Sequence, residues 1–408
     1  MNFLAQGIKK HYGLENRSIL LFFLASFLVQ AAMGSIGVLL NLYILELGFS
    51  EDFAGTVMSA KLFTTGLVCI PAGLICSRWG VGRVLAAGSA ALGLGILTVS
   101  LTASPGLLLA GAVLIGSAMA IKAVSVPLFL VENSSPRTRQ NLFSLNFALM
   151  MFANMAGTAL SGYLPVFWEN ARAGLAGTLG LYGILALISI LPLAFIAPQR
   201  GSTSNPGGQG LLDLKIILKD KNLRRLLVSH SLIGFGAGLI VPLFNIFMSN
   251  KLGASSAQIG VIMSVAQIAT ALGGLLVPLV VGRLGQVATV VVLRLASIPF
   301  LIMIANLTDI YGVGAAYFLR TTLMNMTNPV ESNLTMELAG SNRVGMSSLL
   351  SSMNTITRAI SVLAGGWIMV KYSYGVPYYF TCALYGITTL LFWAWFRPER
   401  QRENQPSE

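Results

Sequence analysis

Charged residues are scarce in this chain of 408 residues, where they make up 10% of the total and only 14 are Asp or Glu. A soluble domain of ordinary composition carries about 25% charged residues. Hydrophobic residues account for 55%, and the mean hydropathy is +0.76. This composition excludes a soluble globular core and predicts a protein that resides in the lipid bilayer.

Side chains for catalysis and metal binding are also few, with two His and three Cys. The sequence has no nucleophile–base pairing, no His/Glu spacing for a metal and no phosphate-binding loop of the ATPase type. Cys69, Cys76 and Cys382 fall inside apolar stretches, where we expect them to serve as packing residues. The sequence therefore predicts no enzyme, no cofactor, no metal centre and no ATP-driven pump.

Twelve apolar stretches approach or exceed the roughly 20 residues that a helix needs to cross a bilayer. They cover 18–46, 52–76, 82–102, 105–131, 141–163, 174–197, 223–249, 256–281, 287–307, 310–336, 344–370 and 376–396. The alternation typical of barrel strands is absent. We predict an all-α membrane protein with twelve transmembrane helices.

The basic residues predict the orientation in the membrane. If the N-terminus lies inside, the cytoplasmic loops hold 18 of the 26 Lys and Arg residues, and the opposite loops hold only Arg172, Lys251 and Lys371. This is the positive-inside bias of a multi-pass protein of the inner (cytoplasmic) membrane with both termini in the cytoplasm. Because the charge is spread over short loops, a nucleic-acid partner is not indicated.

One segment of the chain occurs twice, about half the chain apart. LNLYILELGFSEDFAGTVMS at 40–59 returns as FNIFMSNKLGASSAQIGVIMS at 244–264, so that Asn41 corresponds to Asn245 and Gly55 to Gly260. The offset is 204 or 205 residues. Duplicated membrane halves are typical of secondary transporters, which bind substrate near the midplane between the halves.

The repeat and a hydrophilic interruption divide the chain into parts. We predict an N-terminal six-helix bundle at 1–197, a cytoplasmic linker at 198–222, a C-terminal six-helix bundle at 223–396 and a cytoplasmic tail at 397–408. Apolar positions between Leu211 and Leu218 are compatible with a short interfacial helix. A simple linker explains the same segment equally well.

The loop between the second and third stretches carries a motif. It reads Gly73-Leu-Ile-Cys-Ser77-Arg78-Trp-Gly80-Val-Gly82-Arg83. It resembles the signature of the major facilitator superfamily, Gly-x-x-x-Asp-Arg-x-Gly-Arg-Arg, although Ser77 stands at the Asp position. The second half repeats it weakly as Gly282-Arg283-Leu-Gly285.

That resemblance implies a carrier that works by alternating access, with helices 1, 4, 7 and 10 lining a central cavity. It also implies a gating role for the loop motif and its second copy. The residues concerned are Gly73, Arg78, Gly80, Arg83, Arg283 and Gly285. The alternative for the arginines is that they only anchor the loops on the cytoplasmic side. Two departures, the missing Gly-Pro pair in helix 5 and Ala112 in place of an Arg, separate this chain from the usual drug–proton antiporters.

Five basic residues lie inside predicted spans, where a charge costs at least roughly 2.5–3.5 kcal/mol. They are Lys61, Lys122, Arg294, Arg320 and Arg358. The repeat places Ala266, Thr327, Ile115 and Asn154 opposite Lys61, Lys122, Arg320 and Arg358. Because scaffold residues would be expected in both halves, we predict that these four bind an anionic substrate.

Alternatives are open for several of these charges. Internal pairing of Arg320 or Lys122 with Glu331 would explain them without a ligand. For Arg294, on a helix expected to face lipid, we expect snorkelling or packing against a neighbour. Glu331 itself has two open roles, as a proton carrier or as a salt-bridge partner, and His230 either titrates with it or is a packing residue.

Two further sets of polar residues complete the predicted site. Asn41 and Asn245 recur in both halves on helices expected to line the cavity, where we expect them to form hydrogen bonds between helices and to contact substrate. Asn154 is also predicted to contact substrate. Glu132 with Arg139, and Glu337 with Arg343, end helices 4 and 10 and form either a duplicated cytoplasmic gate or ordinary loop charges.

The sequence thus predicts a monomeric secondary transporter for a small organic anion or an acidic, lipid-like amphipathic molecule, with proton coupling through Glu331 and His230 as an option. The alternative is a proton-coupled efflux pump for hydrophobic drug-like compounds, because the 16 Met and 21 Phe suit an adaptable apolar pocket. A membrane scaffold that binds ligand without moving it is a third class, which the absence of a sizeable soluble domain disfavours.

Overall fold

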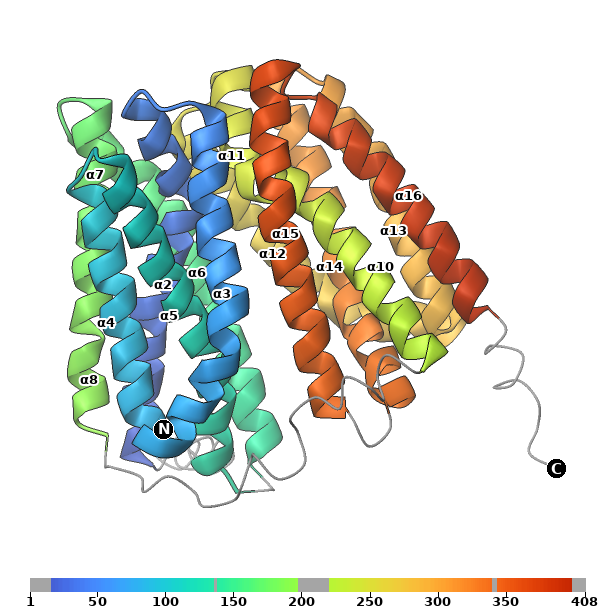
Figure 1. Ribbon diagram of the computed structural model, residues 1–408, viewed down its shortest axis with the longest axis horizontal. Helices are drawn as coiled ribbons and strands as arrows, with labels where there is room; N and C mark the ends of the chain where they lie inside the picture. The colour runs from blue at the N-terminus through green and yellow to red at the C-terminus, as the bar shows by residue number, and fades with distance from the viewer. Residues whose placement is uncertain (1–15, 136–137, 197–219, 340–342, 398–408) are drawn as a thin grey trace, which may run out of the picture. The chain divides into compact units, whose positions relative to one another are not determined.

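The computed structural model describes residues 16–135, 138–196, 220–339 and 343–397, and these are α-helical with no strand among them (Figure 1). The expected interfacial helix, most of the linker and the tail beyond Arg397 lie outside the described residues. The domain boundaries predicted there stay predictions.

The long helices agree closely with the predicted spans. In the first half they are α2 (Arg17–Glu46), α3 (Glu51–Trp79), α4 (Val81–Ser100), α5 (Pro105–Glu132), α6 (Arg139–Tyr163), α7 (Ala171–Ile188) and the short α8 (Ile190–Ala194). In the second half they are α10 (Lys221–Ile240), α12 (Ser256–Leu284), α13 (Gln286–Asn306), α14 (Ile310–Ala339), α15 (Arg343–Lys371) and α16 (Val376–Phe396). After α10 the chain continues through a short 3-10 helix at Val241–Leu243, the short α11 (Phe244–Ile246) and a π-helical turn at Phe247–Lys251.

Local signals in the sequence begin several of these helices. The side chains of Asn16 and Asp220 accept hydrogen bonds from the first free amides of α2 and α10, and Asn170 does the same for α7. Pro105 begins α5, where a missing amide hydrogen costs nothing. Each half therefore opens with a capped helix.

By length and composition, nine helical segments in the described part of the chain qualify as membrane spans. The helices α3, α14 and α15 are equally long but are not among the nine. These three carry Lys61, Arg320, Glu331 and Arg358, on which the predicted site depends.

The described residues form two compact units. The first unit takes in 1–49, 60–205 and 255–264, and the second takes in 50–59, 206–254 and 265–408, as far as these are described. In the first unit α2 packs against α6 and α7, and α4 against α5 and α7. In the second unit α10 packs against α15 and α16, and α13 against α14 and α16. Corresponding helices therefore form corresponding pairs, as the sequence repeat predicts.

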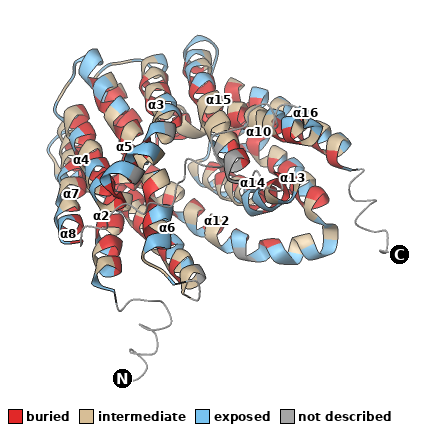
Figure 2. Cartoon of the chain, turned by 60° about the horizontal axis from the view of Figure 1, so that its bottom comes forward, coloured by how far each residue is buried: buried red, intermediate tan, exposed pale blue. Residues whose placement is uncertain are grey.

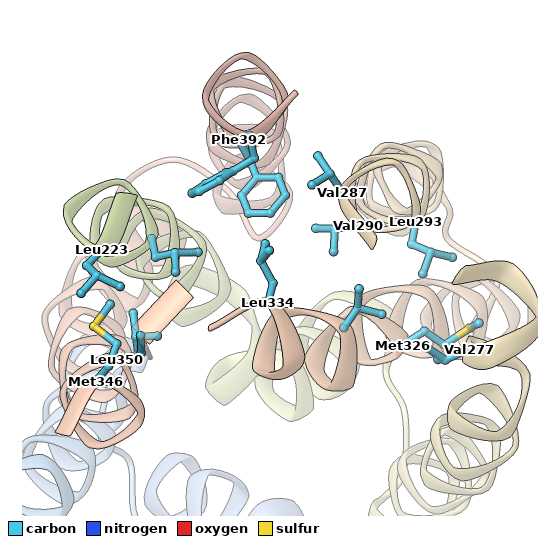
Figure 3. Close-up of a cluster of buried hydrophobic side chains, with 14 residues drawn as sticks. Leu223, Val277, Val287, Val290, Leu293, Met326, Leu334, Met346, Leu350 and Phe392 are labelled. Carbon is cyan, nitrogen blue, oxygen red and sulfur yellow. The ribbon is translucent and has the colours of Figure 1, made fainter. Parts of the chain in front are cut away.

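Each unit has a cluster of buried apolar side chains, and the two clusters correspond. The cluster of the second unit includes Leu223, Leu226, Val290, Leu334 and Met346 (Figure 3). At an offset of 204 or 205 residues, the first unit buries Ile19, Phe22, Leu85, Phe129 and Leu142. The repeat therefore extends from the sequence to the packing of each interior.

Many residues on the outer faces of the helices are exposed, as the pale blue parts of Figure 2 show, and large apolar residues are among them. Leu94, Leu272, Leu279 and Leu390 are each more than half exposed. A soluble monomer rarely exposes so much apolar surface, whereas a lipid-facing surface requires it.

Glycines hold the paired helices close together at corresponding positions. A Cβ atom added to Gly34 of α2 would lie 2.5 Å from the carbonyl oxygen of Asn154, and one added to Gly238 of α10 would lie 2.6 Å from that of Arg358. Gly34 and Gly238 are 204 residues apart, and so are Asn154 and Arg358. Because lipid gives no hydrophobic drive for helices to associate, such close contacts supply the packing energy.

We predict that Gly34→Ala and Gly238→Ala each lower the melting temperature of the purified protein in detergent, by a loss of about 1–3 kcal/mol of stability, because the added methyl overpacks a backbone contact. Gly274→Ala is the control, because a Cβ atom there meets no atom within 4 Å. If the two variants melt like the wild type, the close contacts do not determine the stability.

Candidate functional site

Arg320 and Arg358, here called the arginine pair, lie in the second unit on α14 and α15. Arg320 is only 6% exposed, and its Nη2 donates a hydrogen bond of 2.9 Å to the hydroxyl of Tyr385 on α16. Arg358 interacts electrostatically with both Arg320 and Tyr385. Within the described part of the chain, neither guanidinium has a carboxylate within 4.0 Å, and the Nε atom of each has no hydrogen-bond partner. The pair is thus a concentration of positive charge without an acidic partner.

Aromatic rings surround the arginine pair. Tyr317 lies one turn before Arg320 on α14 and stacks on Phe244, with ring centroids 3.8 Å apart. Tyr378, which is 1% exposed, packs its ring against Phe247 and leaves its buried hydroxyl without a hydrogen-bond partner among the described residues. The surroundings therefore offer hydrogen-bond donors beside apolar ring faces.

A second polar cluster, here called the triad, consists of His230 on α10, Arg294 on α13 and Glu331 on α14. Arg294 Nη2 lies 2.7 Å from Glu331 Oε1, and His230 Nε2 lies 3.3 Å from Glu331 Oε2. The Arg294 guanidinium is 5.3 Å from the ring centroid of Phe392, a member of the apolar cluster in Figure 3. Because the ion pair of Arg294 with Glu331 is buried, removing either partner would leave an uncompensated charge, which makes the pair costly to break.

The triad changes two of the expectations. Glu331 pairs with Arg294 rather than with Arg320 or Lys122, so the arginine pair is not neutralised by the one acid that the sequence placed well inside a span. Of the two alternatives for Arg294, the structure shows packing against a neighbour rather than snorkelling, because the residue is 0% exposed and pairs with Glu331. His230 and Glu331, named together as coupling residues, do lie in contact.

The remaining predicted lysines belong to the first unit. Lys61 on α3 is 9% exposed, and its carbonyl accepts a hydrogen bond of 2.8 Å from Thr65. Lys122 on α5 donates a hydrogen bond to Gln30 Oε1 on α2 and lines a small pocket inside this unit. Asn154 on α6 is partly buried beside Gly34.

The repeated asparagines Asn41 and Asn245 are almost fully buried, at 0% and 2% exposure. The side-chain oxygen of Asn245 accepts a hydrogen bond of 3.0 Å from the amide of Ile246. Their burial agrees with the expected role in holding the helices, and their contact with a substrate stays a prediction.

In the loop motif, the glycines have a defined backbone role. Gly80 and Gly285 precede α4 and α13 with φ of 83° and 76°, a region that favours glycine. Arg78, Arg83 and Arg283 have exposed side chains. Gly73 is not tightly packed, since an added Cβ would only touch Val124 at 3.9 Å. The gating role of these residues stays a prediction.

Two of the charged residues expected at the cytoplasmic gate, Arg139 and Glu337, make hydrogen bonds to neutral partners. Arg139 Nε donates to the Ser134 hydroxyl at 3.3 Å, and no ion pair joins it to Glu132 among the described residues. Glu337 accepts hydrogen bonds of 2.9 Å from Gln286 and from Asn333. The side chain of Arg343 lies outside the described residues, so its pairing with Glu337 is untested.

Sequence reasoning missed two participants in these clusters. Tyr385 was not foreseen, because nothing in the sequence joins a tyrosine on the last helix to an arginine 65 residues earlier. Gln30, the partner of Lys122, was not foreseen either, because the two residues are 92 positions apart. Arg294 was recognised as a basic residue inside a span, but its pairing with Glu331 was not predicted.

No group of three or more His, Cys, Asp or Glu that could hold a metal occurs in the described part of the chain.

Comparison with known proteins identifies the family of the chain. The family model of the Major Facilitator Superfamily matches residues 22–237 and again 226–408, so each half of the chain matches it. No curated protein matches the sequence.

Several solved transporters share the fold. The nucleoside transporter NupG superposes with a TM-score of 0.77 at 14% identity, covering 93% of this chain and 99% of its own. A bacterial homolog of the human lysosomal transporter Spinster, inward-facing and occupied, gives 0.77 at 13% identity, covering 95% and 98%. The D-xylose-proton symporter gives 0.73 at 12% identity, covering 92% and 97%.

At these identities the likeness shows the fold, whereas the family match in both halves shows membership. The two repeated halves, the loop motif and the polar residues within the spans agree with that match. The chain belongs to the Major Facilitator Superfamily and is a multi-pass membrane transporter rather than an enzyme.

Proposed function

We propose that this transporter moves a small organic anion, or an amphipathic molecule with an acidic group, by alternating access. The observation that carries the proposal is the arginine pair, in which Arg320 and Arg358 have no carboxylate partner among the described residues. Two guanidinium groups this deep in a membrane protein are costly unless an anion neutralises them. A carboxylate or phosphate would accept two parallel hydrogen bonds from a guanidinium group.

The aromatic surroundings support the amphipathic form of this substrate. Tyr317 and Phe244 offer ring faces close to Arg320, and the Tyr378 hydroxyl is an unused hydrogen-bond donor. Lys61, Asn41, Asn154 and Asn245 remain secondary candidates for substrate contact. Proteins with the same fold carry quite different substrates, so the chemistry of the site and not the fold supports this choice.

We infer that the triad couples transport to protons. Arg294 at 2.7 Å stabilises the carboxylate of Glu331, while His230 contacts the other carboxylate oxygen at 3.3 Å and titrates near neutral pH in ordinary surroundings. A proton that arrives at His230 changes the net charge of the triad by one. Any conformational change that alters the solvation of this cluster is then linked to proton binding.

The loop motif and the positive-inside bias complete the proposal. We place the protein in the cytoplasmic membrane with both termini inside, working as a monomer, with the motif loops at Gly80 and Gly285 on the cytoplasmic side. Their exposed arginines are then available to contact helix ends or lipid headgroups as the transporter changes state.

We predict that Arg320→Ala and Arg358→Ala each weaken anion binding by at least about tenfold, because each removes charged hydrogen bonds from the substrate. The measurement is the ligand-dependent rise in melting temperature of the purified protein, screened with carboxylates, phosphate esters and acidic lipids. Arg224→Ala, an exposed arginine near the start of α10, is the control. Stabilisation only by cationic or neutral drugs, unchanged in both variants, would favour the drug-efflux alternative.

We also predict that Glu331→Gln and His230→Gln abolish the response of transport to an imposed pH gradient in proteoliposomes, while ligand binding measured by thermal shift persists. The reason is that each change removes a member of the proton-binding cluster. Glu169→Gln, an exposed acid just before α7, is expected to retain the response. A gradient response equal to that of the wild type in both triad variants would exclude the triad from coupling.

A further inference from the structure

A pocket inside the first unit lies at the positions that correspond, by the sequence repeat, to the triad of the second unit. It is lined by α2, α4, α5 and α8 and includes Ser26, Ser89, Lys122 and Val126. At the offset of 204 residues that relates Gly34 to Gly238, Ser26 corresponds to His230. At the offset of 205 that relates Gly80 to Gly285, Ser89 corresponds to Arg294 and Val126 to Glu331. The pocket exists because three large polar side chains of one half are replaced by small or apolar ones in the other.

The charge balance of the two places differs. In the second unit the cation is neutralised by Glu331, 2.7 Å away. In the first unit the cation is Lys122, the acid position is occupied by Val126, and the only partner of the ammonium found in the described residues is the neutral oxygen of Gln30. An ammonium in apolar surroundings without a counter-ion is unfavourable.

Three polar groups of the pocket lie at one height in the unit. Ser26 follows the start of α2 by nine residues, Ser89 follows the start of α4 by eight, and Lys122 precedes the end of α5 by ten. At 1.5 Å per residue these positions are about 12–15 Å from the same end of the bundle. Ser26 and Ser89 are 6% and 4% exposed, and neither hydroxyl makes a hydrogen bond within the described part of the chain. Lys122 is itself only partly buried, so it is reachable from the pocket.

The size of the pocket restricts what it holds. The space inside is about 20 Å³, room for one small ion or water molecule but not for an organic substrate. The remaining wall is apolar, with Phe22, Val29, Leu92 and Ile121. A water molecule would satisfy the hydroxyls but would leave the ammonium charge unbalanced.

We propose that this pocket is a binding site for a small monovalent anion, with chloride as the probe, held by Lys122 and the hydroxyls of Ser26 and Ser89. The anion takes the place that the Glu331 carboxylate has in the second unit. The site is independent of the substrate proposed for the arginine pair.

The test measures the melting temperature of the purified full-length protein in sodium chloride, bromide and gluconate at equal ionic strength. We expect chloride and bromide to raise the melting temperature in a saturable manner, and gluconate, which is too large for the pocket, to have no such effect. Lys122→Met should weaken the apparent chloride affinity by at least about tenfold, because it removes the charged donor. The paired change Ser26→Ala with Ser89→Ala should weaken it while leaving the charge in place.

Two controls and one designed variant make the result specific. Ser117→Ala, another serine of α5 whose hydroxyl already bonds to Val113, should keep the chloride response, and so should Arg320→Ala. Val126→Glu supplies the acid that the second unit has at the corresponding position, and should abolish the response by pairing with Lys122. Equal melting in chloride and gluconate would overturn the proposal and leave the pocket to water. A chloride response that survives both Lys122→Met and Val126→Glu would also overturn it, because the ion would then bind elsewhere.

Discussion

The structure depends on one constraint of the apolar bilayer, which is that polar backbone groups and charged side chains must find their partners inside the protein. Lipid satisfies no hydrogen bonds, so the described chain is helical and its helices associate through close contacts rather than through the hydrophobic effect. Gly34 and Gly238 make those contacts at corresponding places in the two halves. Because the helices are held this closely, each charged side chain inside a unit has only a few possible partners. Whether it finds one determines whether its charge is neutralised within the protein.

The second unit shows both outcomes. Arg294 is neutralised by Glu331 and covered by the Phe392 ring. Its charge is therefore balanced within the unit, and a proton that binds at His230 would change that balance. Arg320 and Arg358 have tyrosines but no acid as partners among the residues that the structure describes, so their charge is available to a ligand. The distinction comes from the surroundings, since all three are arginines within spans. A residue type in a membrane segment therefore signals a function only after its partners are known.

Much of the fold was predictable from the sequence because its causes are local and repeated. Apolar length determined the spans, and the repeat between 40–59 and 244–264 predicted the paired packing of each half. The partners within the site were less predictable. The contacts of Arg320 with Tyr385 and of Lys122 with Gln30 join residues 65 and 92 positions apart, and neither hydropathy nor periodicity carries information about such pairs. For Arg294 the sequence left snorkelling and packing against a neighbour open, and only the structure shows that it packs against Glu331 and Phe392.

The duplication also explains how such a site can arise without disturbing the scaffold. Asn154 and Arg358 occupy corresponding positions, and the carbonyl of each receives the same close approach from a glycine of the partner helix. The backbone at this position is constrained by packing in both halves, whereas the side chain is free to be an amide in one and a guanidinium in the other. Ser89 and Arg294 repeat the pattern, with a small residue beside a pocket in one half and a buried cation in the other. Two copies of a rigid frame therefore permit different chemistry at equivalent points, and asymmetry of charge between otherwise matching positions becomes the feature that distinguishes functional side chains from structural ones.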